Sequence, residues 1–133
     1  RVPDAVLIDP VFLQTLPSRE LRSGFAEVVK HCLIADAGKW QQIRRRDLDR
    51  QDWPNLIAHS VAIKKSVTEA DPTERGLRKI LNFGHTLGHA IETFFLETPQ
   101  HLLHGEAIAV GMLAESYLSH RRGTLTAAEL AQI

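Results

Sequence analysis

Helical periodicity constrains the fold of this chain more than any other feature of its sequence. After residue 17, apolar residues recur every three or four positions, as they do on one face of an α-helix. A single strand-like run, Ala5–Ile8, precedes them, and a strand needs a sheet to pair with. The sequence therefore predicts an all-α domain with one short N-terminal strand, left over from a sheet whose other strands lie outside this sequence.

Turn and cap signals divide the rest of the chain into five helical segments. Gly123 is placed to end the last of them, and Thr126 begins a capping box with Glu129 that opens a further helix just before the chain stops. We therefore expect residues 1–133 to be a single helical domain, cut from a longer protein at both ends. The five segments are predicted from residue 18, within 39–52, from residue 53, at about 77–95 and at about 105–121.

Composition excludes several classes of function. Lys+Arg and Asp+Glu balance at 16 each, so the chain lacks the basic field that nucleic acid or an acidic membrane would require. The longest apolar run, residues 107–114, is far shorter than the ~20 residues of a membrane span, and as a helix apolar all round it predicts a central position. Cys32 is the only cysteine, which favours a reducing compartment and a buried thiol. We expect a cytoplasmic protein that binds neither nucleic acid nor membrane.

Four polar clusters interrupt the apolar helices, where an ionisable group is costly to bury without a partner. In the densest, spacings of 4, 3 and 4 predict one polar stripe along a single helix, formed by Arg78, Asn82, His85 and His89. Each other cluster, taken alone, is more often a surface ion pair, a lysine at the edge of the core or a structural histidine, respectively. These clusters are Glu27 with Lys30, Lys64 with Lys65, and His104 with Glu106.

Together the clusters indicate a metal site with a bound anion. One glutamate and two histidines from three helices, with an open position, are typical of catalytic zinc. The surrounding lysines, arginine and asparagine favour a polyanionic, hydroxyl-rich ligand such as a phosphorylated or carboxylated sugar. His85 and His89 could also both bind one zinc, as in metalloproteases, but Thr86 stands where those enzymes carry their catalytic glutamate.

Four segments carry a further signal: Phe12–Pro17, Ser23–Lys30, Gly76–Glu92 and His104–Met112. They resemble the hallmark segments of the 3-dehydroquinate synthase family, and the resemblance runs from about Ala5 to Gly123. It implies the helical, metal- and substrate-binding C-terminal domain of a dehydroquinate synthase-like fold, without the N-terminal NAD-binding domain.

The resemblance also implies roles for individual residues. The ligands of Zn²⁺ (or Co²⁺) would be Glu27, His85 and His104. His89 would then be no ligand but the histidine that transfers a proton. The residues implied to bind substrate are Lys30, Lys64, Arg78 and Asn82. The residues implied to touch NAD from this side of the cleft are Phe12, Leu13, Gln14 and Thr15.

By the same resemblance, the full protein is a homodimeric, NAD- and zinc-dependent carbon–oxygen lyase of the shikimate pathway. It would convert a phosphorylated keto-sugar acid, 3-deoxy-arabino-heptulosonate 7-phosphate, to 3-dehydroquinate and phosphate, and this piece alone would be inactive. Three alternatives remain: a related cyclase that makes a deoxyinosose or valiolone, a glycerol-type dehydrogenase, and a non-catalytic helical metal-binding module. Glycerol-type dehydrogenases usually carry Asp where this chain has Glu27, and they lack its cationic residues.

Overall fold

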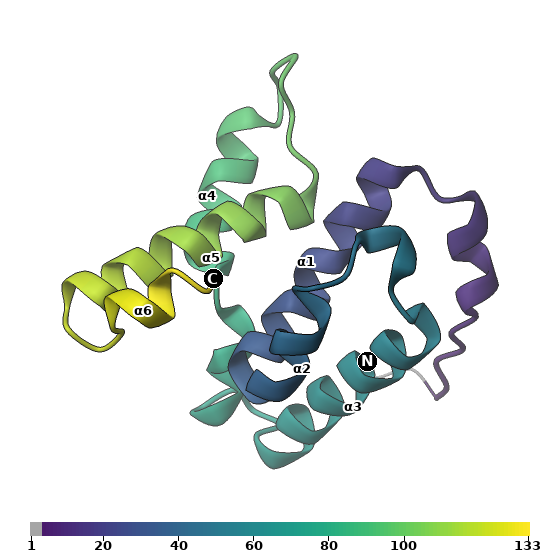
Figure 1. Ribbon diagram of the computed structural model, residues 1–133, viewed down its shortest axis with the longest axis horizontal. Helices are drawn as coiled ribbons and strands as arrows, with labels where there is room; N and C mark the ends of the chain where they lie inside the picture. Colours follow the sequence, from purple (N-terminus) through teal and green to yellow (C-terminus); the bar gives the residue numbers. More distant parts are fainter. Residues whose placement is uncertain (1–3) are drawn as a thin grey trace.

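The computed structural model describes residues 4–133, and every regular element in that range is a helix, which confirms the predicted all-α class. Figure 1 shows the order of these elements. Three are short 3₁₀ helices: η1 (Pro10–Thr15), η2 (Leu48–Arg50) and η3 (Leu77–Asn82). The α-helices are α1 (Ser18–Ala35), α2 (Ala37–Ile43), α3 (Trp53–Ala70), α4 (His85–Phe95), α5 (His104–Arg121) and α6 (Ala127–Leu130).

The helices α1, α2 and α3 enclose a small apolar core. Val28 and Cys32 of α1 pack there with Ile43 of α2 and Leu56 of α3, and all four are buried. Burial raises the pKa of the Cys32 thiol to about 11, so the thiol stays protonated at neutral pH. The predicted core cysteine is confirmed.

Polar caps set the beginnings of several helices where the sequence predicts them. The carboxylate of Asp52 accepts a hydrogen bond from the Asn55 N–H at 3.2 Å, and α3 begins just after it. Thr126 and Glu129 form the predicted capping box of α6, and Gly123, with φ 75°, follows the end of α5. Local signals of this kind act over a few residues and can be read from sequence.

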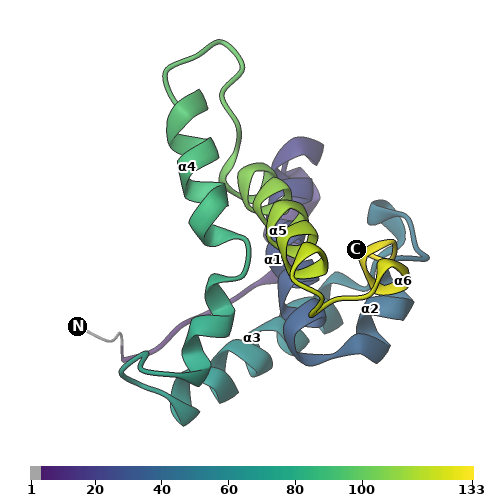
Figure 2. The ribbon, with the colours of Figure 1, turned by 90° about the vertical axis from the view of Figure 1, so that its left-hand side faces the viewer.

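The helices α4 and α5 lie against each other and, with α6, form an arm that projects from the α1–α3 unit (Figures 1 and 2). Their backbones approach very closely. A Cβ atom on Gly111 of α5 would lie 2.0 Å from the carbonyl oxygen of Gly84, so only glycine fits there. The α5 helix also meets α1, where the N–H of Gly105 donates to the Ser23 hydroxyl at 3.0 Å.

The predicted single helix over residues 77–95 is wrong, because the chain bends in its middle. The 3₁₀ helix η3 ends at Asn82, Gly84 takes a left-handed conformation with φ 80°, and α4 begins at His85. The bend is held from another helix, because the Gly84 N–H donates to the Glu115 carboxylate at 2.8 Å. Asn82 and His85 therefore belong to two differently directed helices and do not share one stripe.

The predicted N-terminal strand is also absent from the structure. Residues 5–9 form no regular element, and the described part of the chain contains no strand that could pair with them. Leu7 of this segment is 97% exposed. A strand is stabilised by the hydrogen bonds of its neighbours, so its apolar pattern alone does not form one.

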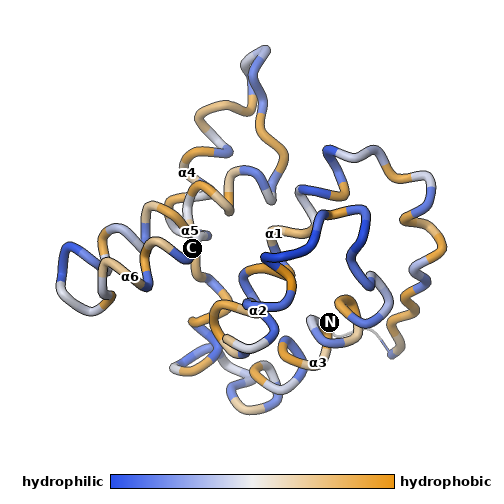
Figure 3. The backbone as a smooth tube through the Cα atoms, in the orientation of Figure 1, coloured by the Kyte–Doolittle hydropathy of each residue, from blue (hydrophilic) through white to orange (hydrophobic). Residues whose placement is uncertain are grey.

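The predicted central position of α5 holds for one face only. Ile108 and Met112 are buried against neighbouring helices, whereas Val110 and Leu113 lie on a face that nothing in residues 4–133 covers. Figure 3 shows such apolar stretches along α4 and α5 as well as in the segment before α1. Among the described helices, we find no candidate for a membrane span.

Candidate metal and substrate site

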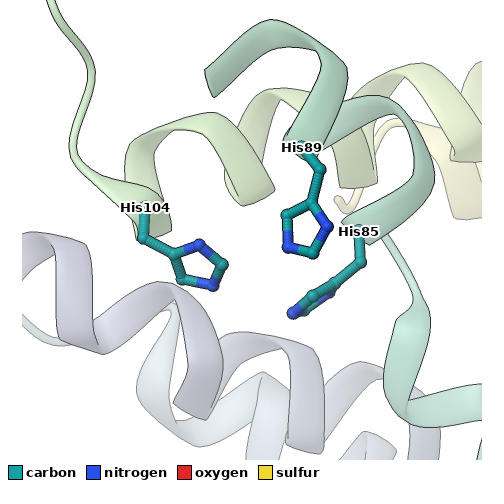
Figure 4. Close-up of side chains that lie close together, drawn as sticks. All are labelled: His85, His89 and His104. Carbon is teal, nitrogen blue, oxygen red and sulfur yellow. The ribbon is translucent and has the colours of Figure 1, made fainter. Parts of the chain in front are cut away.

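Three histidines converge where α4 meets the beginning of α5. His85 and His89 lie one turn apart on α4, and His104 is the first residue of α5. One nitrogen from each ring lies within 4.8 Å of the others. Figure 4 shows the three rings facing a common space, so the fold gathers donors that are far apart in sequence.

Glu27 of α1 faces the same group. Its Oε1 lies 3.6 Å from Nε2 of His85, is buried and has no hydrogen-bond partner within residues 4–133. Its Oε2 accepts a hydrogen bond from Lys30 Nζ at 2.8 Å. Burial alone would raise the pKa of Glu27, but the hydrogen bond and charge of Lys30 outweigh burial and hold that pKa below its ordinary value. The result is an ionised carboxylate with one oxygen left for a cation.

Two of the histidines are oriented as metal ligands usually are. His85 Nδ1 lies 3.3 Å from the Phe83 carbonyl oxygen, and His104 Nδ1 lies 3.2 Å from the Glu92 carboxylate. In metal sites such contacts fix the ring and leave Nε2 for the ion. Burial also lowers the pKa of His85, which favours the neutral imidazole that binds metals.

Two overlapping donor sets therefore exist. The tight cluster contains His85, His89 and His104, whereas Glu27 contacts only His85 among them. In the described chain His89 has no acceptor that orients its ring, in contrast to the other two histidines. The unpartnered Glu27 oxygen and the two oriented rings fit Zn²⁺ with Glu27, His85 and His104 as ligands, and they leave His89 free for another role.

A cavity of about 190 Å³ opens beside this candidate metal site. Lys30 comes from α1, Lys64 from α3, and Arg78 and Asn82 from η3, so three elements bring the four predicted substrate residues together. Glu27 and His85 line the same cavity. Lys30 is 3% exposed, so its pairing with Glu27 is not the surface ion pair that the sequence also allowed.

The loop before η3 is held by one carboxylate. Asp71 accepts hydrogen bonds from the backbone N–H groups of Arg75, Gly76 and Arg78 at 3.1, 2.7 and 3.1 Å. The bonds from Gly76, Arg78 and Arg75, in that order of effect, lower the pKa of Asp71. This network holds the backbone of the loop that leads to Arg78, a residue that lines the cavity.

Two cavity residues escaped the reasoning from sequence. Glu74 takes a left-handed conformation with φ 56° and accepts a hydrogen bond from the Asn82 amide at 2.7 Å. No local pattern marks it, because it lies in a loop. His31 is buried and lines the cavity beside Lys30. Its spacing of four residues from Glu27 was a usable signal, since positions i and i+4 share a helix face.

The residues predicted to touch NAD lie elsewhere. Phe12, Leu13, Gln14 and Thr15 form most of η1, and none of them lines the metal-side cavity. Leu13 and Gln14 border a separate, mainly apolar hollow of about 620 Å³. Contact of η1 with NAD stays a prediction.

Comparison with known proteins assigns the chain to a family. A family model described as 3-dehydroquinate synthase C-terminal matches residues 24–133. The chain belongs to the 3-dehydroquinate synthase C-terminal family. The resemblance read from the histidine-containing segments is thereby confirmed, as is the helical domain that it implies.

Similar proteins carry the same family name. A 3-dehydroquinate synthase from Parabacteroides distasonis is 40% identical over 134 residues, which cover 98% of this chain and 38% of the relative. One from Geobacillus kaustophilus is 48% identical over 124 residues, covering 90% of this chain and 33% of the relative. The chain thus spans between about a third and two fifths of the length of these curated relatives.

A solved structure shares the fold. A 2-epi-5-epi-valiolone synthase from Streptomyces hygroscopicus subsp. jinggangensis, with NAD⁺ and Zn²⁺ bound, matches with a TM-score of 0.79 and 32% identity. The match covers 94% of this chain and 36% of that one. The neighbour therefore contains the same helical domain as part of a longer chain.

Proposed function

We propose that this chain is the metal- and substrate-binding part of a 3-dehydroquinate synthase. The reaction would convert 3-deoxy-arabino-heptulosonate 7-phosphate to 3-dehydroquinate and phosphate, a step of aromatic amino acid biosynthesis. The observation that carries the proposal is the cavity in which three cationic side chains and Asn82 meet Glu27 and His85. The names of the curated relatives support the same reaction.

Glu27, His85 and His104 would hold a Zn²⁺ or Co²⁺ ion. The ion would supply Lewis acidity toward the hydroxyl groups of the substrate. The carboxylate and the two Nε2 atoms would be the donors, because their other polar atoms are already engaged by Lys30, Phe83 and Glu92.

The cationic residues would orient the substrate. Lys30 Nζ has three donor positions, and its bond to Glu27 uses one of them. Lys64 makes no ion pair within residues 4–133, and the Arg78 guanidinium donates only to the Pro72 carbonyl oxygen there, at 3.1 Å. These groups would hold the carboxylate and phosphate of the substrate, and holding a reactant in place itself lowers the barrier.

Asn82 and His89 would act nearer the reacting carbons. The Asn82 amide nitrogen donates to Glu74, so its carbonyl oxygen is left to accept a hydrogen bond from a substrate hydroxyl. The ring centroid of His89 lies 5.2 Å from that of His85 and 5.6 Å from that of His104. We propose that His89 takes up or returns a proton of the substrate rather than binding the metal.

The remaining features belong to the whole protein. Residues Phe12 to Thr15 would contact NAD, which would be held mostly by a part of the protein outside residues 1–133 and would accept and return the hydride. We propose a homodimer in the cytoplasm, and we expect residues 1–133 alone to lack turnover.

The direct test is phosphate release from 3-deoxy-arabino-heptulosonate 7-phosphate by the complete protein that contains this chain. We expect release that requires both NAD and Zn²⁺ and that yields 3-dehydroquinate. A complete protein that holds both cofactors but releases no phosphate would show the assignment to be wrong.

A related sugar phosphate cyclase is the second candidate, favoured by the valiolone synthase neighbour. The cluster of Lys30, Lys64 and Arg78 argues instead for a substrate with a carboxylate in addition to its phosphate. A keto-sugar phosphate without the carboxylate should therefore be a poor substrate. Faster turnover of that compound would favour the second candidate.

A further inference from the structure

His31 and Ser60 form a buried polar pair to which the proposed mechanism assigns no role. His31 lies on α1, next to Lys30, and Ser60 lies on α3. The His31 Nδ1 atom hydrogen-bonds to the Ser60 hydroxyl, and both residues are buried. A buried imidazole is stabilised only when its polar atoms find partners, so the second nitrogen of this ring needs an explanation.

The second nitrogen faces the cavity. His31 lines the cavity together with Lys30, Lys64 and Arg78. Within residues 4–133, its Nε2 has no hydrogen-bond partner, yet it is not sealed from solvent as the unpartnered Nδ1 of His59 is. The open side of the His31 ring is therefore the side toward the cavity.

Ser60 selects the form of the ring. The Ser60 hydroxyl has no other hydrogen-bond partner in the described chain. If Nδ1–H donated to the hydroxyl oxygen, the hydroxyl hydrogen would be buried without an acceptor, which is costly. If the hydroxyl donates to Nδ1 instead, both groups are satisfied and the ring carries its hydrogen on Nε2. Burial and the charge of Lys30 lower the pKa of His31 to about 4, so the ring stays neutral at physiological pH.

We propose that His31, held by Ser60 with its hydrogen on Nε2, is a further ligand-binding residue that donates a hydrogen bond to an oxyanion in this cavity. A neutral donor adds a contact without adding a fourth positive charge to those of Lys30, Lys64 and Arg78. The oxyanion is a carboxylate or a phosphate oxygen of the bound sugar acid, and its identity as part of that substrate rests on the function proposed above.

Binding measurements on the complete, zinc-loaded protein test this inference. Isothermal titration calorimetry with inorganic phosphate and with 3-dehydroquinate, which carries a carboxylate but no phosphate, separates the two sources of the oxyanion. The variant His31→Phe removes the hydrogen-bond donor, whereas His31→Gln retains an N–H donor. The matched control is His59→Phe, because His59 lies beside Ser60 on α3 but pairs with Asp36 at 2.9 Å and lines a different hollow.

We expect His31→Phe to lower the affinity of the protein for one of the two ligands, phosphate or 3-dehydroquinate, about tenfold or more. A loss of this size is typical when a hydrogen bond to a charged group is removed. The affinities of His31→Gln should stay within about threefold of those of the unchanged protein. The affinities of His59→Phe should equal those of the unchanged protein. If the affinity for phosphate falls, the group that accepts the His31 hydrogen bond is the phosphate of the substrate. If the affinity for 3-dehydroquinate falls, that group is the carboxylate. Unchanged affinity for both in His31→Phe, or an equal loss in His59→Phe, would overturn the inference.

Two further outcomes keep the test decisive. If His31→Phe does not fold, Ser60→Ala replaces it, with an expected loss of about threefold or more because the ring is no longer held in one form; unchanged binding would then refute the role of the pair. If the unchanged protein binds either oxyanion but does not turn over the heptulosonate phosphate, the proposed reaction is wrong. The variants would still test the role of His31 in that case. If that protein binds neither oxyanion, the inference itself is wrong.

Discussion

The Glu115 carboxylate on α5 accepts a hydrogen bond from the Gly84 backbone N–H at 2.8 Å, and this contact fixes the bend that precedes α4. The bend joins Asn82, which lines the cavity of about 190 Å³, to His85, which lines the same cavity and also belongs to the histidine cluster. One residue on a distant helix therefore sets the relation between the two halves of the site.

The bend should tolerate no side chain at residue 84. A Cβ there would lie 2.5 Å from Met112 Cγ and 2.8 Å from the Ile108 carbonyl oxygen, in addition to the cost of a left-handed alanine. We expect Gly84→Ala to lower the free energy of unfolding by about 3 kcal/mol or more. Urea denaturation of the chain measures it.

Gly123→Ala is the matched control for this prediction. Gly123 has a similar φ of 75°, but no atom lies within 4 Å of the Cβ it would gain. Only the conformational cost of about 1 to 2 kcal/mol should appear there. Equal losses in the two variants would show that the contact between α4 and α5 does not need glycine.

Metal analysis distinguishes the two overlapping donor sets. If Glu27, His85 and His104 hold Zn²⁺, Glu27→Ala and His104→Ala should lose the ion, whereas His89→Ala should keep one ion and lose turnover. The physical reason is that the His89 ring lacks the orienting acceptor that the other two rings have. Elemental analysis after dialysis counts the zinc in each variant. A His89→Ala protein without zinc, together with a zinc-loaded Glu27→Ala protein, would assign the ion to the three histidines instead.

Arg78 should govern substrate affinity. Its guanidinium lines the cavity, whereas Lys79 next to it lines a different hollow and is exposed. Removing a charge-assisted contact costs about 1.5 to 3 kcal/mol, so Arg78→Ala should raise KM about tenfold to a hundredfold. Steady-state kinetics of the complete protein gives this value, and Lys79→Ala should leave KM unchanged. A KM in Arg78→Ala equal to that of the unchanged protein would exclude this contact.

His31 should make the free energy of unfolding depend on pH in a defined window. Burial and Lys30 lower the pKa of His31 from 6.5 to about 4 in the folded chain, so the unfolded chain binds more protons between these values. The stability contributed by the neutral ring is complete above pH 6.5 and is lost as pH falls toward 4. This one group contributes a slope of at most about 1.4 kcal/mol per pH unit.

Urea denaturation at several pH values tests the slope. The His31→Gln variant lacks the titrating ring, so its free energy of unfolding should fall less steeply between pH 6.5 and 4. His85, whose pKa burial also lowers, acts in the same direction in both proteins and cancels in the comparison. Parallel curves for the two proteins would contradict the burial argument for His31.

The sequence by itself determined the helices and most of their ends, and it named most of the residues that line the candidate site. Periodicity and caps such as Asp52 and Thr126 act within a few residues, so they can be read locally. The family segments likewise named Glu27, His85 and His104 before any geometry was known. In the structure, the four residues predicted to bind substrate line one cavity.

Only the tertiary structure decided where the chain bends and which polar groups meet. The left-handed turn at Gly84 depends on Glu115, 31 residues away, and the tautomer of His31 depends on Ser60, 29 residues away. Residues 5–8 have a strand-like pattern but form no strand, because a strand requires partners that residues 4–133 do not provide. Local pattern specifies what a segment can form, whereas contacts between distant segments select the conformation that forms.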